Sequence, residues 1–122
     1  MIKELVYLAT PYSGSDEEMD FRAIIVNSIA KDLANEGVMV YSPVSSWHEI
    51  ASKYKMPRNY EFWKDMCETF VSKCDKVIVV ILPGWHDSVG VRGEVEFARD
   101  NNIKVEYLDP TPYIAHLGME LL

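Results

Sequence analysis

The sequence contains few cysteines, and this shortage excludes a disulfide-stabilised protein. Only two of its 122 residues are cysteines, Cys67 and Cys74. They stand seven positions apart in a stretch patterned as one helix, which separates them by roughly 10 Å, too far for a disulfide. We therefore expect reduced thiols, as in a cytoplasmic protein.

Basic residues are also scarce, with 12 Lys and Arg against 19 Asp and Glu and a formal net charge of −7. A polymeric nucleic-acid partner requires clustered Lys and Arg that release counterions from the phosphates. The composition therefore argues against a DNA or RNA partner. A single small nucleotide remains compatible with it, because helix N-termini and loop amides can hold one phosphate without a basic surface.

Long apolar runs and metal-binding spacings are missing as well. No apolar stretch approaches the span of a bilayer, and "MIKELVYLAT" matches neither a signal nor a transit peptide, so we expect no membrane partner and a cytoplasmic location. His48, His86 and His116 show no close spacing with each other or with the cysteines. We therefore expect no metal site and no cofactor.

The remaining pattern fits one domain over residues 1–122, of which 48% are hydrophobic, with no repeat, low-complexity tract or linker. Short apolar, β-rich runs alternate with helical patterns. The expected strands are 5–10, 38–43, 76–82 and 104–109, the expected helices are 15–37, 45–54, 60–74 and 88–101, and a loose or helical tail covers 110–122. This order predicts an α/β, flavodoxin-like three-layer sandwich with a four- to five-stranded parallel sheet.

Ligands of open parallel sheets bind at the carboxyl ends of the strands, which directs attention to three loops. They read "TPYSGSD" (10–16), "SPVSSWHE" (42–49) and "PGWHDSVG" (83–90). Among their residues, Ser13 offers a hydroxyl, Gly14 permits a close approach of the backbone to a ligand, and Trp85 offers a flat face for stacking. Each loop alone is well explained by turn formation, but their convergence on one edge favours a binding site.

The helix over residues 88–101 contains two glutamates that its geometry separates. Val91, Val95 and Ala98 form one stripe, and at 100° per residue Glu94 lies within about 60° of it while Glu96 is roughly 140° from Val91. Glu96 is therefore expected to face water and Glu94 to face the protein. The spacing leaves two interpretations of Glu94 open. It either lines a cavity at the strand ends with a raised pKa, or it is held structurally by Arg92 or Arg99 or by a hydrogen bond to Tyr7 or Tyr12.

Three segments together resemble the nucleoside 2-deoxyribosyltransferase superfamily, which also contains the 2'-deoxynucleoside 5'-monophosphate N-glycosidases. They are "VYLATPYSG" (6–14), "KCDKVIVVILPGW" (73–85) and "SVGVRGEVEFARDNNIKVEYLD" (88–109). The similarity is greatest to a small phage and bacterial branch catalogued as a domain of unknown function. Its most specific part is the pattern S-x-G-x-x-x-E that begins at Ser88.

The resemblance implies roles for particular residues of this sequence. Glu94 takes the position of the family's nucleophile, and Tyr12 that of the tyrosine that hydrogen-bonds and orients it. Ser88 and Gly90 resemble the positions that contact the sugar or its 5'-phosphate. The 5'-monophosphate glycosidases carry an arginine in the loop after the first strand, and "TPYSGSD" has none.

The resemblance also implies a proton donor for the leaving base, either Asp65 in the helix over 60–74 or Asp87 in the loop before Ser88. The same helix carries an aromatic and apolar set that suits a core or a subunit interface, and we expect a homodimer or higher homo-oligomer. The set comprises Phe62, Trp63, Met66 and Phe70.

The expected function is cleavage or transfer of the N-glycosidic bond of a (deoxy)nucleoside or nucleotide through a glutamate nucleophile. The alternatives are a non-catalytic nucleotide-binding or sensing domain, and a small α/β module that recruits a protein partner. Base release that depends on Glu94 would distinguish the first from the others.

Overall fold

Four parallel strands form one sheet in the order β2-β1-β3-β4 within residues 3–118, the part of the chain that the computed structural model describes. The strands are β1 (Leu5–Ala9), β2 (Met39–Tyr41), β3 (Lys76–Val80) and β4 (Lys104–Leu108). The helices are α1 (Asp16–Asn35), α2 (Pro43–Lys53), α3 (Tyr60–Lys73), α4 (Val89–Asp100) and α5 (Thr111–His116), with a single 3₁₀ turn, η1 (Trp85–Asp87).

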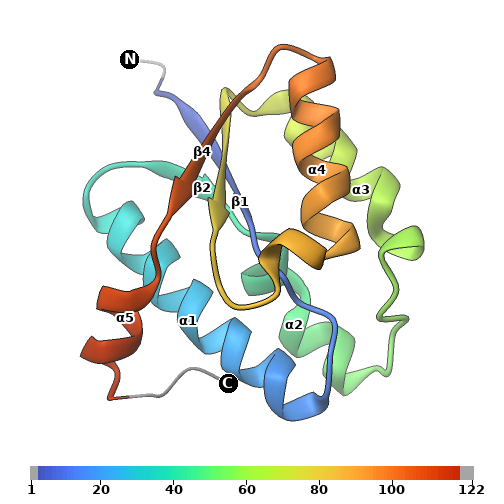
Figure 1. Cartoon of the computed structure of the whole chain (residues 1–122), viewed down its shortest axis with the longest axis vertical. Helices are drawn as coiled ribbons and strands as arrows, with labels where there is room; N and C mark the ends of the chain where they lie inside the picture. Colours follow the sequence, from blue (N-terminus) through green and yellow to red (C-terminus); the bar gives the residue numbers. More distant parts are fainter. Residues whose placement is uncertain (1–2, 119–122) are drawn as a thin grey trace.

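Helices cover both faces of the sheet, which confirms the predicted α/β, flavodoxin-like three-layer architecture (Figure 1). Alternate residues of β1 serve the two faces, as expected for a strand with a side-chain period of two. Tyr7 and Ala9 pack with residues of α3 and α4, whereas Leu8 packs with residues of α1 and with Ile114 of α5. The two cores are therefore separated by the sheet itself.

The two central strands define the place where a ligand is expected. β1 lies directly beside β3, with Ala9 opposite Val79 near their carboxyl ends. The helix after β1, α1, packs on one face, and the helix after β3, α4, packs on the other. Adjacent strands whose connections leave to opposite faces open a crevice between their carboxyl ends.

The predicted element boundaries differ from the structure mainly around the second strand. It ends at Tyr41, and α2 begins at Pro43, two residues before the predicted start. The reason is local, because Ser42 caps the helix by accepting a hydrogen bond from the Ser45 amide at 3.1 Å and proline suits the first helical turn. The third strand likewise ends at Val80, before its predicted end at residue 82.

The C-terminal tail contains the short helix α5, and the predicted tail residues 119–122 lie outside the described range. In the described sheet, β4 is an edge strand and pairs with β3. Within residues 3–118, no helix combines the length and the apolar character needed to cross a bilayer.

Candidate functional site

A cavity of about 600 Å³ opens at the carboxyl ends of the central strands. Its wall comes from the loop after β1, from α1 and α2, from α3 with the preceding loop, and from the loop after β3 with the first turns of α4. The volume lies in the range of small-molecule sites. Four aromatic rings contribute to the lining, those of Tyr12, Trp47, Tyr60 and Trp63.

The geometry predicted for the two glutamates of α4 is confirmed. Glu94 is only 4% exposed and lines the cavity, whereas Glu96 is exposed to solvent. Val91, Val95 and Ala98 are buried, as the helical spacing requires. A nearly fully buried glutamate therefore forms part of the cavity wall.

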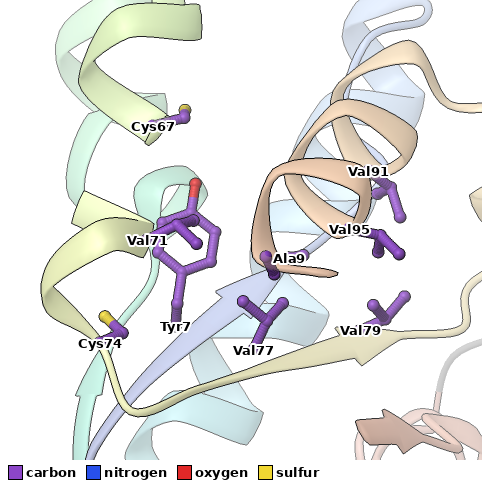
Figure 2. Close-up of a cluster of buried hydrophobic side chains, with 10 residues drawn as sticks. Tyr7, Ala9, Cys67, Val71, Cys74, Val77, Val79, Val91 and Val95 are labelled. Carbon is purple, nitrogen blue, oxygen red and sulfur yellow. The ribbon is translucent and has the colours of Figure 1, made fainter. Parts of the chain in front are cut away.

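The hydrogen-bond partner of Glu94 is Tyr7, whose hydroxyl donates to the carboxyl group. Figure 2 shows Tyr7 rising from β1 between α3 and α4 with its hydroxyl directed toward Cys67. Both interpretations left open by the sequence thus apply together, since Glu94 lines the cavity and is also held by a tyrosine. Arg99 is not its partner and instead donates to the Tyr107 hydroxyl at 3.0 Å.

Burial controls the ionisation of this group. Desolvation raises the pKa of Glu94 to about 8, although hydrogen bonds from Tyr7 and Cys67 act in the opposite direction. Burial, followed by the nearby Glu94, raises the pKa of Tyr7 well above its usual value, so the phenol keeps its proton and remains a donor. A glutamate poised near neutral pH is typical of groups that perform proton or nucleophilic chemistry.

Two further residues of the cavity wall have hydroxyls without a partner in residues 3–118. The side-chain oxygens of Thr10 and Tyr60 are buried and make no hydrogen bond to any described residue. An unsatisfied buried hydroxyl costs about 1–3 kcal/mol, so both groups favour a ligand that offers polar atoms. The sequence analysis did not select either residue, because their lack of partners depends on packing between distant segments.

The position of Tyr60 depends on two glycines of α4. A Cβ atom placed on Gly93 would lie 2.9 Å from the Tyr60 ring, and one placed on Gly90 would lie 3.2 Å from it. The glycines therefore let the ring of Tyr60 lie close against the first turns of α4, which also carry Glu94.

Tyr12 lines the cavity as predicted, but its hydroxyl does not bond to Glu94. It lies 2.6 Å from Nδ1 of His48, and Nε2 of His48 lies 2.8 Å from Asp20. The reason is positional, because Tyr12 follows β1 in the loop that faces α2, whereas Tyr7 stands within β1 beneath α3 and α4. His48 showed no signal in the sequence, since its two partners come from separate segments.

Several other predicted binding residues also line the cavity. They are Ser13, Ser88 and Gly90. Ser88 is in addition the N-cap of α4, and its hydroxyl accepts a hydrogen bond from the Val91 amide at 3.2 Å. Gly14 lies outside the lining, because it packs beside Glu18 at the start of α1.

The remaining predicted residues are less well placed. Trp85 lies outside the cavity because its ring packs against Tyr107 of β4, with the ring centres 5.6 Å apart. Asp65 is exposed on α3 and also lies outside the cavity. Asp87 does line the cavity, but its side chain is 84% exposed and lies 3.4 Å from His86.

The loop after β1 contains no arginine, but two arginines from other segments, Arg22 and Arg58, line the cavity. Arg22 of α1 donates to the backbone oxygens of Tyr12 and Ser13, at 3.1 and 2.8 Å. Arg58, which precedes α3, pairs with Asp16 at 2.6 Å. Both guanidinium groups thus hold the loop after β1 and contribute positive charge to its surroundings.

The described part of the chain holds no group of three or more His, Cys, Asp or Glu side chains able to bind a metal ion.

No curated protein matches the sequence. One family model does match, over residues 4–109, and thus covers nearly all of the described structure, including every element of the cavity wall. The chain therefore belongs to the family described as a domain of unknown function, DUF1937.

Proposed function

We propose that the protein cleaves or transfers the N-glycosidic bond of a (deoxy)nucleoside or nucleotide, with Glu94 as the nucleophile. The observation that carries the proposal is the buried Glu94 carboxyl, held by Tyr7, in the wall of a cavity of about 600 Å³. The resemblance to the nucleoside 2-deoxyribosyltransferase superfamily supports the same assignment.

The lining of the cavity suits both halves of a nucleoside. The rings of Trp47 and Trp63, whose centres are 5.3 Å apart, offer faces on which a base can stack. Thr10 and Tyr60 belong to the lining, and their buried, unpartnered hydroxyls would gain from hydrogen bonds to a sugar. A polar ligand with one flat apolar part matches this combination.

The electrostatics of Glu94 favour stabilisation of the transition state. Rupture of the bond between C1' and the base nitrogen leaves positive charge on the sugar, and a carboxylate beside it stabilises that charge. Burial makes the ionised carboxylate costly, so Glu94 gains more from a neighbouring cationic sugar than a solvated carboxylate would.

The reaction then has two steps. An oxygen of Glu94 bonds to C1', and the electron pair of the broken bond leaves with the base, which takes up a proton. Water or a second base next attacks C1' and releases the carboxylate. If water accepts the sugar, the protein is a hydrolase; if a second base accepts it, the protein is a transferase. A cytoplasmic location, where both buried cysteines stay reduced, belongs to the same proposal.

Release of free base tests the proposal. The wild type, incubated with the common 2'-deoxynucleosides and their 5'-monophosphates, should release base detectable by chromatography. Glu94→Gln should lower the rate by at least about a thousandfold, because it removes the nucleophile and leaves the shape of the side chain unchanged. The matched control is Glu96→Gln, on the exposed side of the same helix, which should retain the wild-type rate.

A specific observation also supports a second candidate, a nucleotide-binding domain without turnover. A Glu94 with a pKa of about 8 is largely protonated at neutral pH, and a neutral carboxyl can donate a hydrogen bond to a base or sugar. That candidate predicts a ligand-dependent rise in melting temperature without base release, and little effect of Glu94→Gln on binding.

A further inference from the structure

A hydrogen-bonded chain of three side chains leads from the surface to the cavity. Asp20 of α1 lies 2.8 Å from Nε2 of His48 in α2, and Nδ1 of His48 lies 2.6 Å from the Tyr12 hydroxyl in the loop after β1. His48 and Tyr12 line the cavity, whereas Asp20 stands outside the lining. The His48 side chain is 17% exposed and that of Asp20 is 67% exposed.

The chemistry of these groups fixes the direction of one hydrogen bond. An ionised Asp20 can only accept, so Nε2–H of His48 donates to it. The other ring nitrogen, Nδ1, then faces the Tyr12 oxygen. In neutral His48 it accepts the Tyr12 proton, and in protonated His48 it donates to the Tyr12 oxygen and leaves the Tyr12 O–H free to point elsewhere.

We propose that Tyr12 is the catalytic acid that protonates the departing base, and that His48 and Asp20 are positioning residues that supply and hold its proton. This inference rests on the proposed function. It also gives Tyr12 a role different from orienting the nucleophile, which the structure assigns to Tyr7.

The proton balance closes over the two steps. The reacting form carries an ionised Glu94 and a protonated His48. As the bond from C1' to the base breaks, an oxygen of Glu94 bonds to C1' and the electron pair of the broken bond stays on the base nitrogen. That nitrogen takes the Tyr12 hydroxyl proton, and Tyr12 takes the Nδ1 proton of His48. Neutral His48, still donating to Asp20, is left behind. When water attacks C1', one of its protons returns through Tyr12 to His48, and the Glu94 carboxylate leaves the sugar.

The alternative acids are poorly placed for this role. Asp65 lies outside the cavity, and Asp87 is 84% exposed beside His86. Tyr12 is instead half-buried in the cavity wall, with a histidine at hydrogen-bond distance.

The same three residues could serve only to fasten α2 to α1. A purely structural link would change folding stability and would affect every substrate equally. A proton donor, in contrast, matters only when the leaving base needs a proton. A 7-methylpurine nucleoside supplies the discriminating probe, because its cationic base departs as a neutral molecule without added protonation.

The test compares Tyr12→Phe and His48→Gln with the wild type on the common 2'-deoxynucleosides, their 5'-monophosphates and 7-methyl-2'-deoxyguanosine. On the unmethylated substrates both variants should lose at least about a hundredfold in kcat, and on the methylated substrate less than about threefold. Glu94→Gln should abolish release from all of them. The matched control, Glu49→Gln, changes an exposed neighbour of His48 and should behave as the wild type.

Each other outcome has a definite meaning. If the wild type releases base but Tyr12→Phe slows all substrates equally, or slows none, the assignment of Tyr12 as the acid is wrong while the proposed function stands. If the wild type releases no base from any substrate, the proposed function fails and this inference fails with it. Because both kinds of substrate are measured on the same protein, partial unfolding of a variant cannot imitate the predicted difference.

Discussion

At the scale of single residues, the most unusual feature of the described structure is the buried carboxyl group of Glu94. Glu94 is 4% exposed, has no cationic partner in the structure described, and relies on hydrogen bonds from Tyr7 and Cys67. Such a group lowers the stability of the folded protein whenever it is ionised. Its presence is therefore better explained by function than by folding.

The raised pKa of Glu94 predicts a particular dependence of stability on pH. Below its ordinary pKa of 4.5 the folded and unfolded states are both protonated, and Glu94 adds no pH dependence. Between 4.5 and about 8 the unfolded state ionises while the folded state keeps its proton, so stability falls as pH rises, by up to about 1.4 kcal/mol per pH unit. Above that range the loss levels off.

Urea unfolding between pH 5 and pH 8.5 measures this effect. Glu94→Gln should lack the decline that Glu94 causes and should be more stable than the wild type at the alkaline end, while Glu96→Gln should follow the wild type. Parallel curves for the wild type and Glu94→Gln would show that the buried carboxyl does not have the assigned pKa.

The sequence was informative about Glu94 because its burial follows from helical spacing alone. It was not informative about the partners of that residue. Tyr7 lies within the first strand and Tyr12 in the loop after it, and the packing of α3 and α4 on Tyr7 decides which of them reaches Glu94. The chain from Tyr12 through His48 to Asp20 likewise needs the packing of α1 and α2, which no local pattern encodes.

At the scale of elements, α4 is built to present Glu94 beside Tyr60. The helix begins at its N-cap, Ser88, and the first two turns carry Gly90 and Gly93 on the side that faces the Tyr60 ring. Glycine inside a helix costs about 1 kcal/mol relative to alanine. The two glycines therefore lower the stability of α4 but allow the Tyr60 ring to approach the helix closely.

Substitution of Gly93 tests this packing. A Cβ atom at this position would lie 2.9 Å from the Tyr60 ring, so Gly93→Ala should displace the ring, destabilise the protein by about 1–2 kcal/mol and reduce activity. In a Tyr60→Ala background the same substitution should instead stabilise the protein by up to about 1 kcal/mol, because only the helix propensity remains. Thermal unfolding of the wild type, the two single variants and the double variant measures the effect of Gly93→Ala in each background. An equal effect in both backgrounds would contradict the contact between Gly93 and the Tyr60 ring.

The element types followed from the sequence more closely than their ends did. Apolar strand runs and helical stripes depend on local periodicity, which the sequence displays directly. The ends of β2 and β3 depend instead on where backbone pairing stops and a capping side chain takes over. Ser42, predicted to lie within a strand, is the cap of α2 for this reason.

At the scale of the whole molecule, the site is a product of topology. The order β2-β1-β3-β4 places β1 beside β3, and the helices that follow these two strands lie on opposite faces. The cavity lies at the point where the two connections diverge. The rule for parallel sheets could therefore locate the site from the sequence, although it could not supply its volume or its hydrogen bonds.

Self-association through α3 stays a prediction at this scale. Phe62, Met66 and Phe70 are exposed on α3 at a spacing of four residues, and the Phe70 ring stacks on Tyr41 with centres 3.9 Å apart. Apolar side chains in such a row suit an interface between copies of the chain.

Localisation of a covalent sugar tests the central claim most directly. The protein is mixed with a cleaved 2'-deoxynucleoside, quenched with acid, digested, and its peptides are examined by mass spectrometry. A deoxyribosyl adduct on Glu94, absent from Glu94→Gln and present in Glu96→Gln, is the predicted result. Base release that continues at the wild-type rate in Glu94→Gln, or an adduct on another side chain, would contradict the account.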